Sequence, residues 1–418
     1  MPRDGSGIYT TPVGTTAVPD TTIESAKYNN NVADVAADLN APRPIVAGGT
    51  GANNAVDAAI NLGVVSGKTA ITYTEAEKAV ARNNIAAAPF DALAYNGMQI
   101  NGSMEVSQEK GTAGSGALGY INDGWQIYFM GTMLPYYASS PHPDWVAGIP
   151  SWIEIALSTA QPALGAADSV QLYQAIEGYR IARLHWGYAD AKPISIGFWT
   201  MHVRTGLYSV VVRNSTGNRN YATTYTHNVG GTPQYNVVTI PGCTDGVWSI
   251  GNTIGMYVIF TMAAGSSGIA PTPNVWLTAT YAAAPGQING VAAATDVFRI
   301  TGVVVLPGTQ APTAAQSPLI MRPYDQELAI CQRYWQKVTA SMRYYATVST
   351  QNNSVTYPFL AEMRAAPTIT LTGAGSNSGN LSDFTLVALD ARTAVLNIVG
   401  TTGDIYSNGR SWSLDARL

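Results

Sequence analysis

The sequence predicts a mainly β protein, in which a central jelly-roll β-sandwich and a smaller C-terminal β-sandwich follow an N-terminal segment of extended chain and short helical repeats. Three observations indicate this fold class. Only 11% of the residues are charged, against about 25% in average proteins. Short apolar alternations are separated by turn residues at intervals of about 8–12 residues, which is typical of a sandwich. Ala-rich units that are too short to fold alone precede these strands.

Residues 1–44 contain one helical pattern between arms rich in Pro and Thr. From Ile23 to Leu39, the larger apolar side chains fall on one face. Thr21 or Thr22 can cap this helix, and prolines end it shortly after Leu39. A short amphipathic helix between extended arms buries little of its own surface, so we expect residues 1–44 to dock on another protein.

Residues 45–96 contain a repeated pattern that begins after a Gly-Gly-Thr-Gly sequence. Each unit is a short Ala-rich helix, and Asn61-Leu-Gly63 of the first unit aligns with Asn84-Ile-Ala86 of the second. One chain cannot bury the apolar face of so small a unit, whereas stacking between identical chains can cover it. We therefore expect a homotrimer in which residues 45–96 form a shaft.

Residues 97–310 have the strand and turn pattern of one jelly-roll domain. The segment from Lys192 to Val203 alternates first on Ile196 and Phe198 and then shifts phase at Trp199, which predicts a β-bulge in this strand. The other predicted strands end at turn residues such as Asn-Ser-Thr-Gly and Pro-Gly. They run from Leu207 to Val212, from Tyr235 to Ile240, from Met256 to Met262 and from Asp296 to Leu306.

Residues 311–337 read as a linker followed by a connecting helix, because Leu328, Cys331 and Trp335 have helical spacing. Residues 338–418 then return to alternating strands separated by Gly-rich turns, which predicts the second, smaller β-sandwich.

Composition and charge exclude several classes of function. The formal net charge is −4. Lys and Arg form no cluster of the kind that binds a phosphate backbone, so we expect no nucleic-acid partner. No run of about 18 apolar residues occurs, which predicts no membrane insertion. The N-terminus also lacks the basic and apolar regions of a secretory signal.

No motif carries recognisable catalytic or metal chemistry. The stretch from Gly63 to Thr69 misses the spacing of a phosphate loop, the histidines have no HExxH spacing, and there is no GxSxG elbow. Cys243 and Cys331 form no CxxC pair, and whether either forms a disulfide stays open. We predict a protein that is not an enzyme and holds no metal or cofactor. Carboxylates that could pair in space leave a depolymerase open: Asp123, Asp144, Glu154, Asp168 and Glu177.

Several sequence blocks resemble tail-fibre and appendage proteins of bacteriophages that infect alphaproteobacteria. They include the opening Met1-Pro-Arg-Asp-Gly-Ser-Gly-Ile-Tyr, the block Thr22-Ile-Glu-Ser-Ala-Lys-Tyr-Asn and the shaft-like Pro44-Ile-Val-Ala-Gly-Gly-Thr-Gly. Further blocks, Ile300-Thr-Gly-Val-Val-Val-Leu-Pro-Gly and Arg322-Pro-Tyr-Asp-Gln-Glu-Leu, are similar to the jelly-roll domain of these fibres and to its connector. The resemblance spans residues 1 to about 335.

This resemblance implies a location on the virion, in a tail, baseplate or neck fibre. It implies that residues 1–44 attach to other virion proteins and that the β-sandwich domains recognise a host cell-surface glycan. Two alternatives stay open: a purely structural neck or collar fibre without a receptor, and a tailspike-type depolymerase. The depolymerase fits less well, because tailspikes of that type need the regular coils of a long β-helix and residues 97–418 have no such period.

Aromatic residues between Trp125 and Trp152 are the candidates for glycan binding. Aromatic faces stack on the C–H groups of sugars, and a few polar side chains can hydrogen-bond hydroxyl groups. Pro141, Pro143 and Pro150 predict a surface loop here. Alternatively, these aromatics fill one end of the sandwich. The predicted binding residues are Trp125, Tyr136, Tyr137, His142, Asp144 and Trp145.

Overall fold

The computed structural model describes residues 24–41, 49–52, 54–62, 97–112, 118–130, 135–146, 148–157 and 159–418, together with residues 13 and 22. In the strand 135–146, only the side chain of Val146 is described. The chain divides into two compact units, Met1–Pro89 and Phe90–Leu418. The second Ala-rich repeat, residues 75–86, and most of the arms of residues 1–44 lie outside the described residues.

The first unit contains helix α1 (Ser25–Asn40) and helix α2 (Ala55–Leu62). Both helices lie where apolar periodicity predicts them. The backbone N–H of Ala41 donates to carbonyl groups of the last turn of α1, which ends the helix just before the predicted proline stop.

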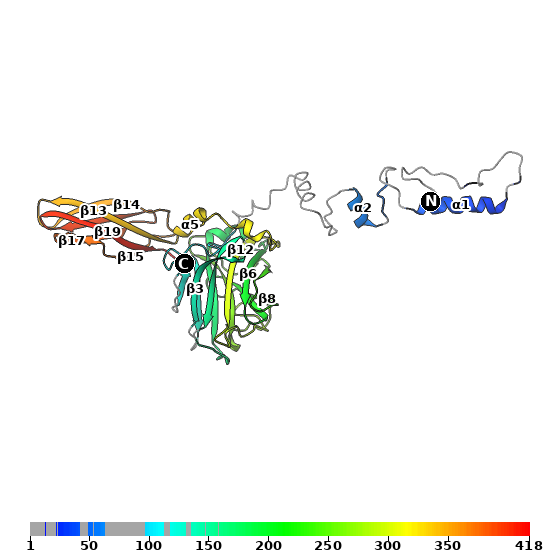
Figure 1. Ribbon diagram of the computed structural model, residues 1–418, viewed down its shortest axis with the longest axis horizontal. Coiled ribbons are helices and arrows are strands. Elements are labelled where there is room, and N and C mark those ends of the chain that lie inside the picture. Colours follow the sequence, from blue (N-terminus) through cyan, green and yellow to red (C-terminus); the bar gives the residue numbers. More distant parts are fainter. Residues whose placement is uncertain are drawn as a thin grey trace. The chain divides into compact units, whose positions relative to one another are not determined.

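The second unit begins with a large β-sandwich of two antiparallel sheets, which confirms the predicted mainly β class (Figure 1). One sheet has the strand order β1-β2-β5-β10-β7-β8-β11, and the other has the order β3-β4-β12-β6-β9. The strands are β1 (Gly119–Asn122), β2 (Trp125–Met130), β3 (Pro135–Val146), β4 (Ile149–Leu157), β5 (Ser169–Glu177), β6 (Ile194–His202), β7 (Gly206–Arg213), β8 (Asn220–His227), β9 (Gln234–Ile240), β10 (Ile254–Ala264), β11 (Trp276–Leu277) and β12 (Val297–Pro307).

The core of this sandwich lies between its two sheets. Phe198 of β6 and Phe260 of β10 are fully buried and meet edge to face, with ring centroids 4.9 Å apart. Burial of one such side chain stabilises the fold by about 1.5–3 kcal/mol. These residues belong to the inward-facing positions of strands that alternate between core and outer face.

The predicted β-bulge lies in β12 and not in the strand that contains Trp199. Strand β6 pairs regularly with β9, whereas the register between β6 and β12 shifts between Thr301 and Val304. Gly302 has φ +60 there, a conformation that glycine adopts without strain. The apparent phase shift has another cause: the Trp199 indole donates to Ser317 Oγ at 2.8 Å, so a later segment covers the outer face of β6.

The second unit ends with the predicted smaller sandwich. Helix α5 (Tyr324–Gln332) leads into two sheets with the orders β13-β19-β15 and β14-β18-β17. Phe384 and Trp412 meet edge to face in its core. The strands are β13 (Trp335–Ala346), β14 (Gln351–Pro358), β15 (Thr368–Gly373), β16 (Ser376–Asn377), β17 (Leu381–Ala388), β18 (Thr393–Gly400) and β19 (Gly403–Asp415).

Candidate functional site

Trp125, the first predicted glycan-binding residue, is a core residue. Its side chain is 0% exposed, its indole N–H donates to the carbonyl of Asn101 at 3.0 Å, and its ring lies 6.1 Å from that of Phe260. The side chain faces inward from β2, so a sugar cannot reach it. The prediction that Trp125 binds glycan is therefore wrong, and for this residue the alternative of an aromatic filling the sandwich holds.

The other predicted binding residues lie on β3, and their side chains are outside the described residues: Tyr136, Tyr137, His142, Asp144 and Trp145. The expectation of a surface loop is wrong at Pro141, which lies in β3 and pairs with Ser151 of β4, and at Pro150, which lies in β4. Pro143 also lies in β3, but the register shifts between Pro141 and Val146 and gives it no partner in β4. Prolines are tolerated in β3 because it is the edge strand of its sheet. Trp125 lies on β2, in the opposite sheet of the sandwich.

A groove with a volume of about 440 Å³ lies on the outer face of the seven-stranded sheet. We call it the tyrosine groove, after Tyr128, Tyr173, Tyr257 and Tyr281, which line it together with Arg213. Strands β2, β5, β10 and β7 supply its floor, and residues 267–282 supply one wall. The strand period places these residues outward, because their neighbours point into the core, as Leu172, Val212 and Val258 do.

The floor of the tyrosine groove is a cluster of two rings and one guanidinium group. Tyr257 and Arg213 are directly paired across β10 and β7, and the guanidinium carbon lies 4.9 Å from the centre of the Tyr257 ring. The rings of Tyr173 and Tyr257 meet edge to face at 5.8 Å. Cross-strand neighbours of this kind fix each other's rotamers. The groove therefore presents preformed aromatic surfaces next to a cation.

Polar groups accompany the rings of the tyrosine groove. The Tyr173 hydroxyl donates to Gln126 Oε1 at 2.9 Å, and burial raises the pKa of Tyr173. Tyr128 is 39% exposed and lies opposite Gln171, whose side chain also lines the groove. Within the described part of the chain, neither the Tyr128 hydroxyl nor the Gln171 carboxamide has a hydrogen-bond partner. Both groups are thus available to a ligand.

A small second core supports the wall of the tyrosine groove. Val211 and Ile259, on the outer face of the sheet, are covered by Ala270 and Ala284 of the loop that follows β10. The backbone N–H of Ala284 also donates to Ser209 Oγ at 2.9 Å. Because apolar contacts and hydrogen bonds hold this loop on the sheet, the groove keeps its shape without a ligand.

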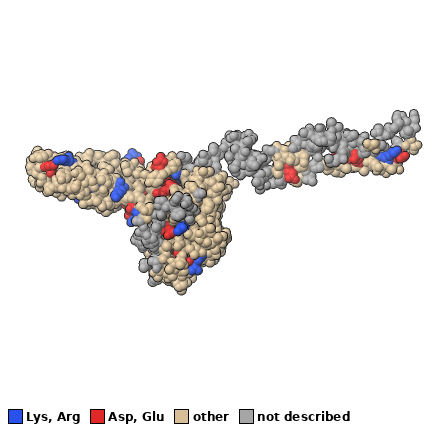
Figure 2. Space-filling view, viewed as in Figure 1, with Lys and Arg blue, Asp and Glu red and all other residues tan. Residues whose placement is uncertain are grey.

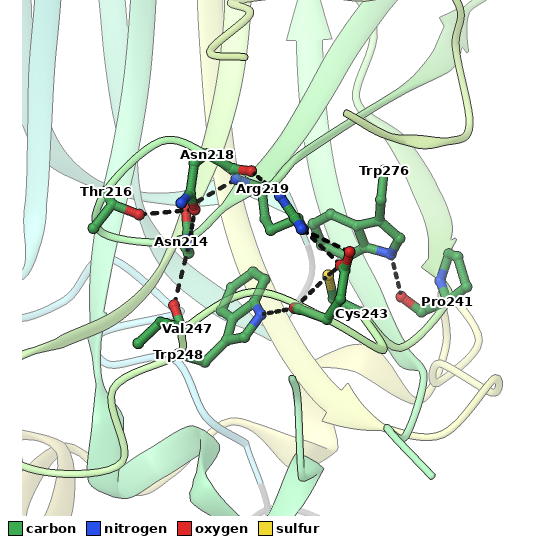
Figure 3. Close-up of polar contacts among 10 residues, drawn as sticks. Asn214, Thr216, Asn218, Arg219, Pro241, Cys243, Val247, Trp248 and Trp276 are labelled. Carbon is green, nitrogen blue, oxygen red and sulfur yellow. Dashed lines mark hydrogen bonds and ion pairs between the residues drawn. The ribbon is translucent and has the colours of Figure 1, made fainter. Parts of the chain in front are cut away.

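Three indoles form a cluster in another part of the sandwich, and Figure 3 shows two of them, Trp248 and Trp276. Trp186 and Trp248 meet edge to face at 4.6 Å, and Trp276 lies 5.5 Å from Trp186. Each indole N–H donates to a backbone carbonyl: Trp186 to Lys192, Trp248 to Asp245 and Trp276 to Pro241. With their polar atoms bonded within the chain, these tryptophans serve packing.

Cys243 lies beside the indole cluster and is completely buried (Figure 3). Its thiol donates to the Asp245 carbonyl at 3.3 Å, while Arg219 holds the Asp245 carboxylate with two bonds of 2.6 Å. Burial raises the pKa of Cys243 to about 11. A thiolate is the reactive form of cysteine, so this thiol is unreactive at neutral pH. Both Cys243 and Cys331 are free, which settles the disulfide question for this structure.

Charged groups are sparse on the described part of the face shown in Figure 2, where they form separate spots. Among the described residues, no group of three or more His, Cys, Asp or Glu could hold a metal ion. In that same part of the chain, no helix is long and apolar enough to cross a membrane.

Four of the five carboxylates considered for catalysis have hydrogen-bond or ion-pair partners within the chain. Asp123 accepts two bonds from Gln108, and Glu154 pairs with Arg299 at 2.6 Å. Glu177 accepts bonds from Arg333 and Tyr334, and Asp168 accepts one from the Gly165 backbone. The side chain of Asp144 lies outside the described residues.

No protein-family profile and no curated protein matches the chain. Structural similarity is found to the enzymatically active domain of tailspike protein 4 from bacteriophage CBA120, with 12% identity, a TM-score of 0.28 and coverage of 51% of this chain and 22% of that chain. A putative sugar binding protein from Bacteroides thetaiotaomicron is 11% identical, with a TM-score of 0.28 and coverage of 50% and 99%.

A family 11 carbohydrate-binding module from Clostridium thermocellum, solved with a mixed-linked tetrasaccharide, is 10% identical, with a TM-score of 0.23 and coverage of 45% and 91%. The present chain thus spans under a quarter of the tailspike chain that it resembles. At these identities and TM-scores the similarities carry no argument about function. The β-sandwich class rests on the sheets of the chain itself.

Proposed function

We propose that this chain is a bacteriophage fibre protein that binds a host-surface glycan through the tyrosine groove and does not cleave it. The observation that carries the binding proposal is the groove itself, in which four tyrosines and Arg213 surround a space of about 440 Å³. This volume falls within the range of about 300–1,000 Å³ that is typical of ligand sites.

The chemistry of the tyrosine groove suits a saccharide. Sugar rings have apolar C–H faces and polar hydroxyl edges, so a binding site needs aromatic faces with a few hydrogen-bonding groups between them. Tyr128 and Tyr257 supply rings on separate strands, and Gln171 lies on β5 directly opposite Tyr128. Because the floor spans four neighbouring strands, more than one sugar residue can contact it.

The virion assignment and the trimer extend the proposal beyond the groove. The N-terminal sequence blocks that resemble phage appendage proteins support attachment to the particle through residues 1–44. An exposed apolar stripe on α1, formed by Tyr28, Val32, Val35 and Leu39, supports assembly with further copies of the chain. A purely structural fibre would share these features but would have no use for a preformed polar groove.

Binding without catalysis is supported by the placement of the carboxylates. A glycosidase needs two carboxyl groups facing one bond, about 5–10 Å apart. Asp168 is the one carboxylate on the described lining of the groove, and it bonds the backbone of its own loop. We therefore expect glycan chains to leave the protein uncut.

A glycan array probed with the full chain tests the proposal. The Tyr128→Ala variant should bind array hits about 3- to 10-fold more weakly, the size of one lost aromatic contact. Tyr345→Ala is the matched control, because Tyr345 is 68% exposed on the smaller sandwich, and it should bind like the wild type. Equal loss in both variants, or none in Tyr128→Ala, would reject the groove as the site. The absence of any array hit would favour the purely structural fibre.

A further inference from the structure

Arg213 is a partly buried arginine that forms no ion pair with any described residue, in contrast to three others of the second unit. The guanidinium groups of Arg219, Arg299 and Arg333 each pair with a carboxylate at 2.6–2.7 Å. Among the described residues, no hydrogen bond or ion pair is formed by the Arg213 side chain, whose one specific contact is the face of Tyr257. An arginine that is half-buried without a partner costs stability, which suggests that its partner comes from outside the chain.

The surroundings of Arg213 favour an incoming anion. Burial lowers its pKa, and the side chains that act on it are the tyrosines at positions 257, 173 and 128 rather than any carboxylate. Asp168, at another part of the lining, accepts the backbone N–H of Gly165 at 2.7 Å and forms no ion pair with Arg213. The positive charge of Arg213 at the floor thus has no carboxylate partner among the described residues, and it lies where water is partly excluded and the charge is poorly screened.

We propose that the tyrosine groove selects acidic saccharides, with Arg213 binding the carboxylate of a uronic acid residue while the tyrosines contact the sugar faces. This inference rests on the proposed glycan-binding function and adds its substrate class. The guanidinium carbon lies 4.9 Å from the centre of the Tyr257 ring, and the side-chain N–H groups of Arg213 donate to no described residue, so they can donate to a ligand. The planar edge of a guanidinium group matches the two oxygens of a carboxylate and forms two parallel hydrogen bonds.

The test measures binding of the full chain to acidic oligosaccharides by calorimetry. The probes are galacturonate, alginate and glucuronate-containing oligosaccharides, each compared with its methyl ester, which keeps the sugar and removes the charge. A charge-assisted bond predicts that at least one acid binds about 10- to 100-fold more tightly than its ester. Raising the salt concentration should weaken binding of the acid and leave the ester unaffected.

Variants at Arg213 distinguish the effect of losing the positive charge from the effect of unfolding. Arg213→Gln should lose the preference for the acid and keep binding of the ester, and Arg213→Lys should keep only part of the preference, because it cannot form two parallel bonds. Arg392→Gln is the control, because Arg392 pairs with Glu362 on the exposed surface of the smaller sandwich. Circular dichroism melting curves check that each variant is folded.

Each outcome decides between the two proposals. Equal binding of acid and ester that Tyr128→Ala weakens and Arg213→Gln does not would overturn the acidic preference and keep the glycan-binding groove. A sulfated galactan bound more tightly than every uronate would overturn the carboxylate assignment. If neither Tyr128→Ala nor Arg213→Gln changes binding, both the acidic preference and the tyrosine groove as the binding site are overturned. If no acid binds, the acidic preference alone is overturned.

Discussion

Asp123 is a buried carboxylate with a raised pKa. It is 8% exposed, and its two oxygens accept bonds from the backbone N–H and the side-chain amide of Gln108. Burial outweighs these bonds and raises the pKa of Asp123 to about 6. The native protein therefore holds a proton on Asp123 at pH values where the unfolded chain, with an ordinary pKa of about 3.9, has released it.

This shift predicts a pH dependence of stability. Between about pH 4 and pH 6 the native state binds more protons than the unfolded state at this position, so the contribution of Asp123 to the free energy of unfolding falls as the pH rises. Asp123→Asn cannot titrate. Relative to wild type, the variant should therefore gain about 2–3 kcal/mol between pH 4 and pH 7. Urea unfolding at pH 4, 5.5 and 7 measures the difference, and parallel pH profiles for the two proteins would contradict it.

Individual residues also show why the sequence did not predict the tyrosine groove. Trp125 and the aromatics of β3 are dense along the sequence, but the groove is built from Tyr173, Arg213 and Tyr257, which are far apart in sequence and adjacent across strands. Sequence alone places each on the outer side of an alternating strand. Which strands are neighbours depends on sheet order, and local periodicity does not encode it.

At the scale of elements, a buried ion pair joins helix α5 to the loop that precedes β1. Arg322 and Glu327 are each 4% exposed, and their charged atoms lie 3.0 Å apart. Glu327 also accepts the backbone N–H of Asn101, and Arg322 donates to the carbonyls of Gly97 and Gln99. This ion pair thus forms hydrogen bonds with backbone groups of residues 97–101, which precede the first strand of the large sandwich.

Removing one partner of this pair should strongly destabilise the second unit. Glu327→Gln leaves the Arg322 charge buried and uncompensated, which predicts a loss of about 3–5 kcal/mol in the free energy of unfolding. Glu362→Gln removes the carboxylate of an exposed pair and should cost less than about 1 kcal/mol. Chemical denaturation of the full chain measures both. Similar losses in the two variants would show that burial does not govern the pair.

Elements were predicted well where strong apolar periodicity ends at turn residues. The strands from Leu207 and Met256 lie close to the predicted bounds, although a loop covers part of their outer face. The predicted connecting helix is present as α5 and contains Leu328 and Cys331, but Trp335, which was expected to continue its spacing, lies in β13. The strand that contains Trp199 misled the prediction, because a covering segment buries both of its faces and erases the alternation. The prolines of β3 misled it because an edge strand tolerates them.

At the scale of the whole molecule, apolar surface remains uncovered in a single chain. In the smaller sandwich, Val355 of the edge strand β14 pairs with buried Leu396, yet Val355 itself is 47% exposed. The apolar face that is buried at Leu396 therefore extends to Val355 on the edge strand, where it is exposed. In the first unit, the stripe on α1 has the alternating spacing of four and three residues that is typical of coiled coils. Both features favour association of identical chains.

The α1 stripe leads to a prediction about assembly. Because the side chains of Val32 and Val35 are 48% and 37% exposed, burial between copies would remove them from water and stabilise a homotrimer. Light scattering of the full chain should give about three times 44.0 kDa, and the double variant Val32→Asp with Val35→Asp should shift the protein toward monomer. Asn30→Asp with Ala37→Asp adds the same charge to the opposite, exposed side of the helix and should stay trimeric. A wild-type monomer, or equal dissociation in both double variants, would rule out the α1 stripe as the trimer contact.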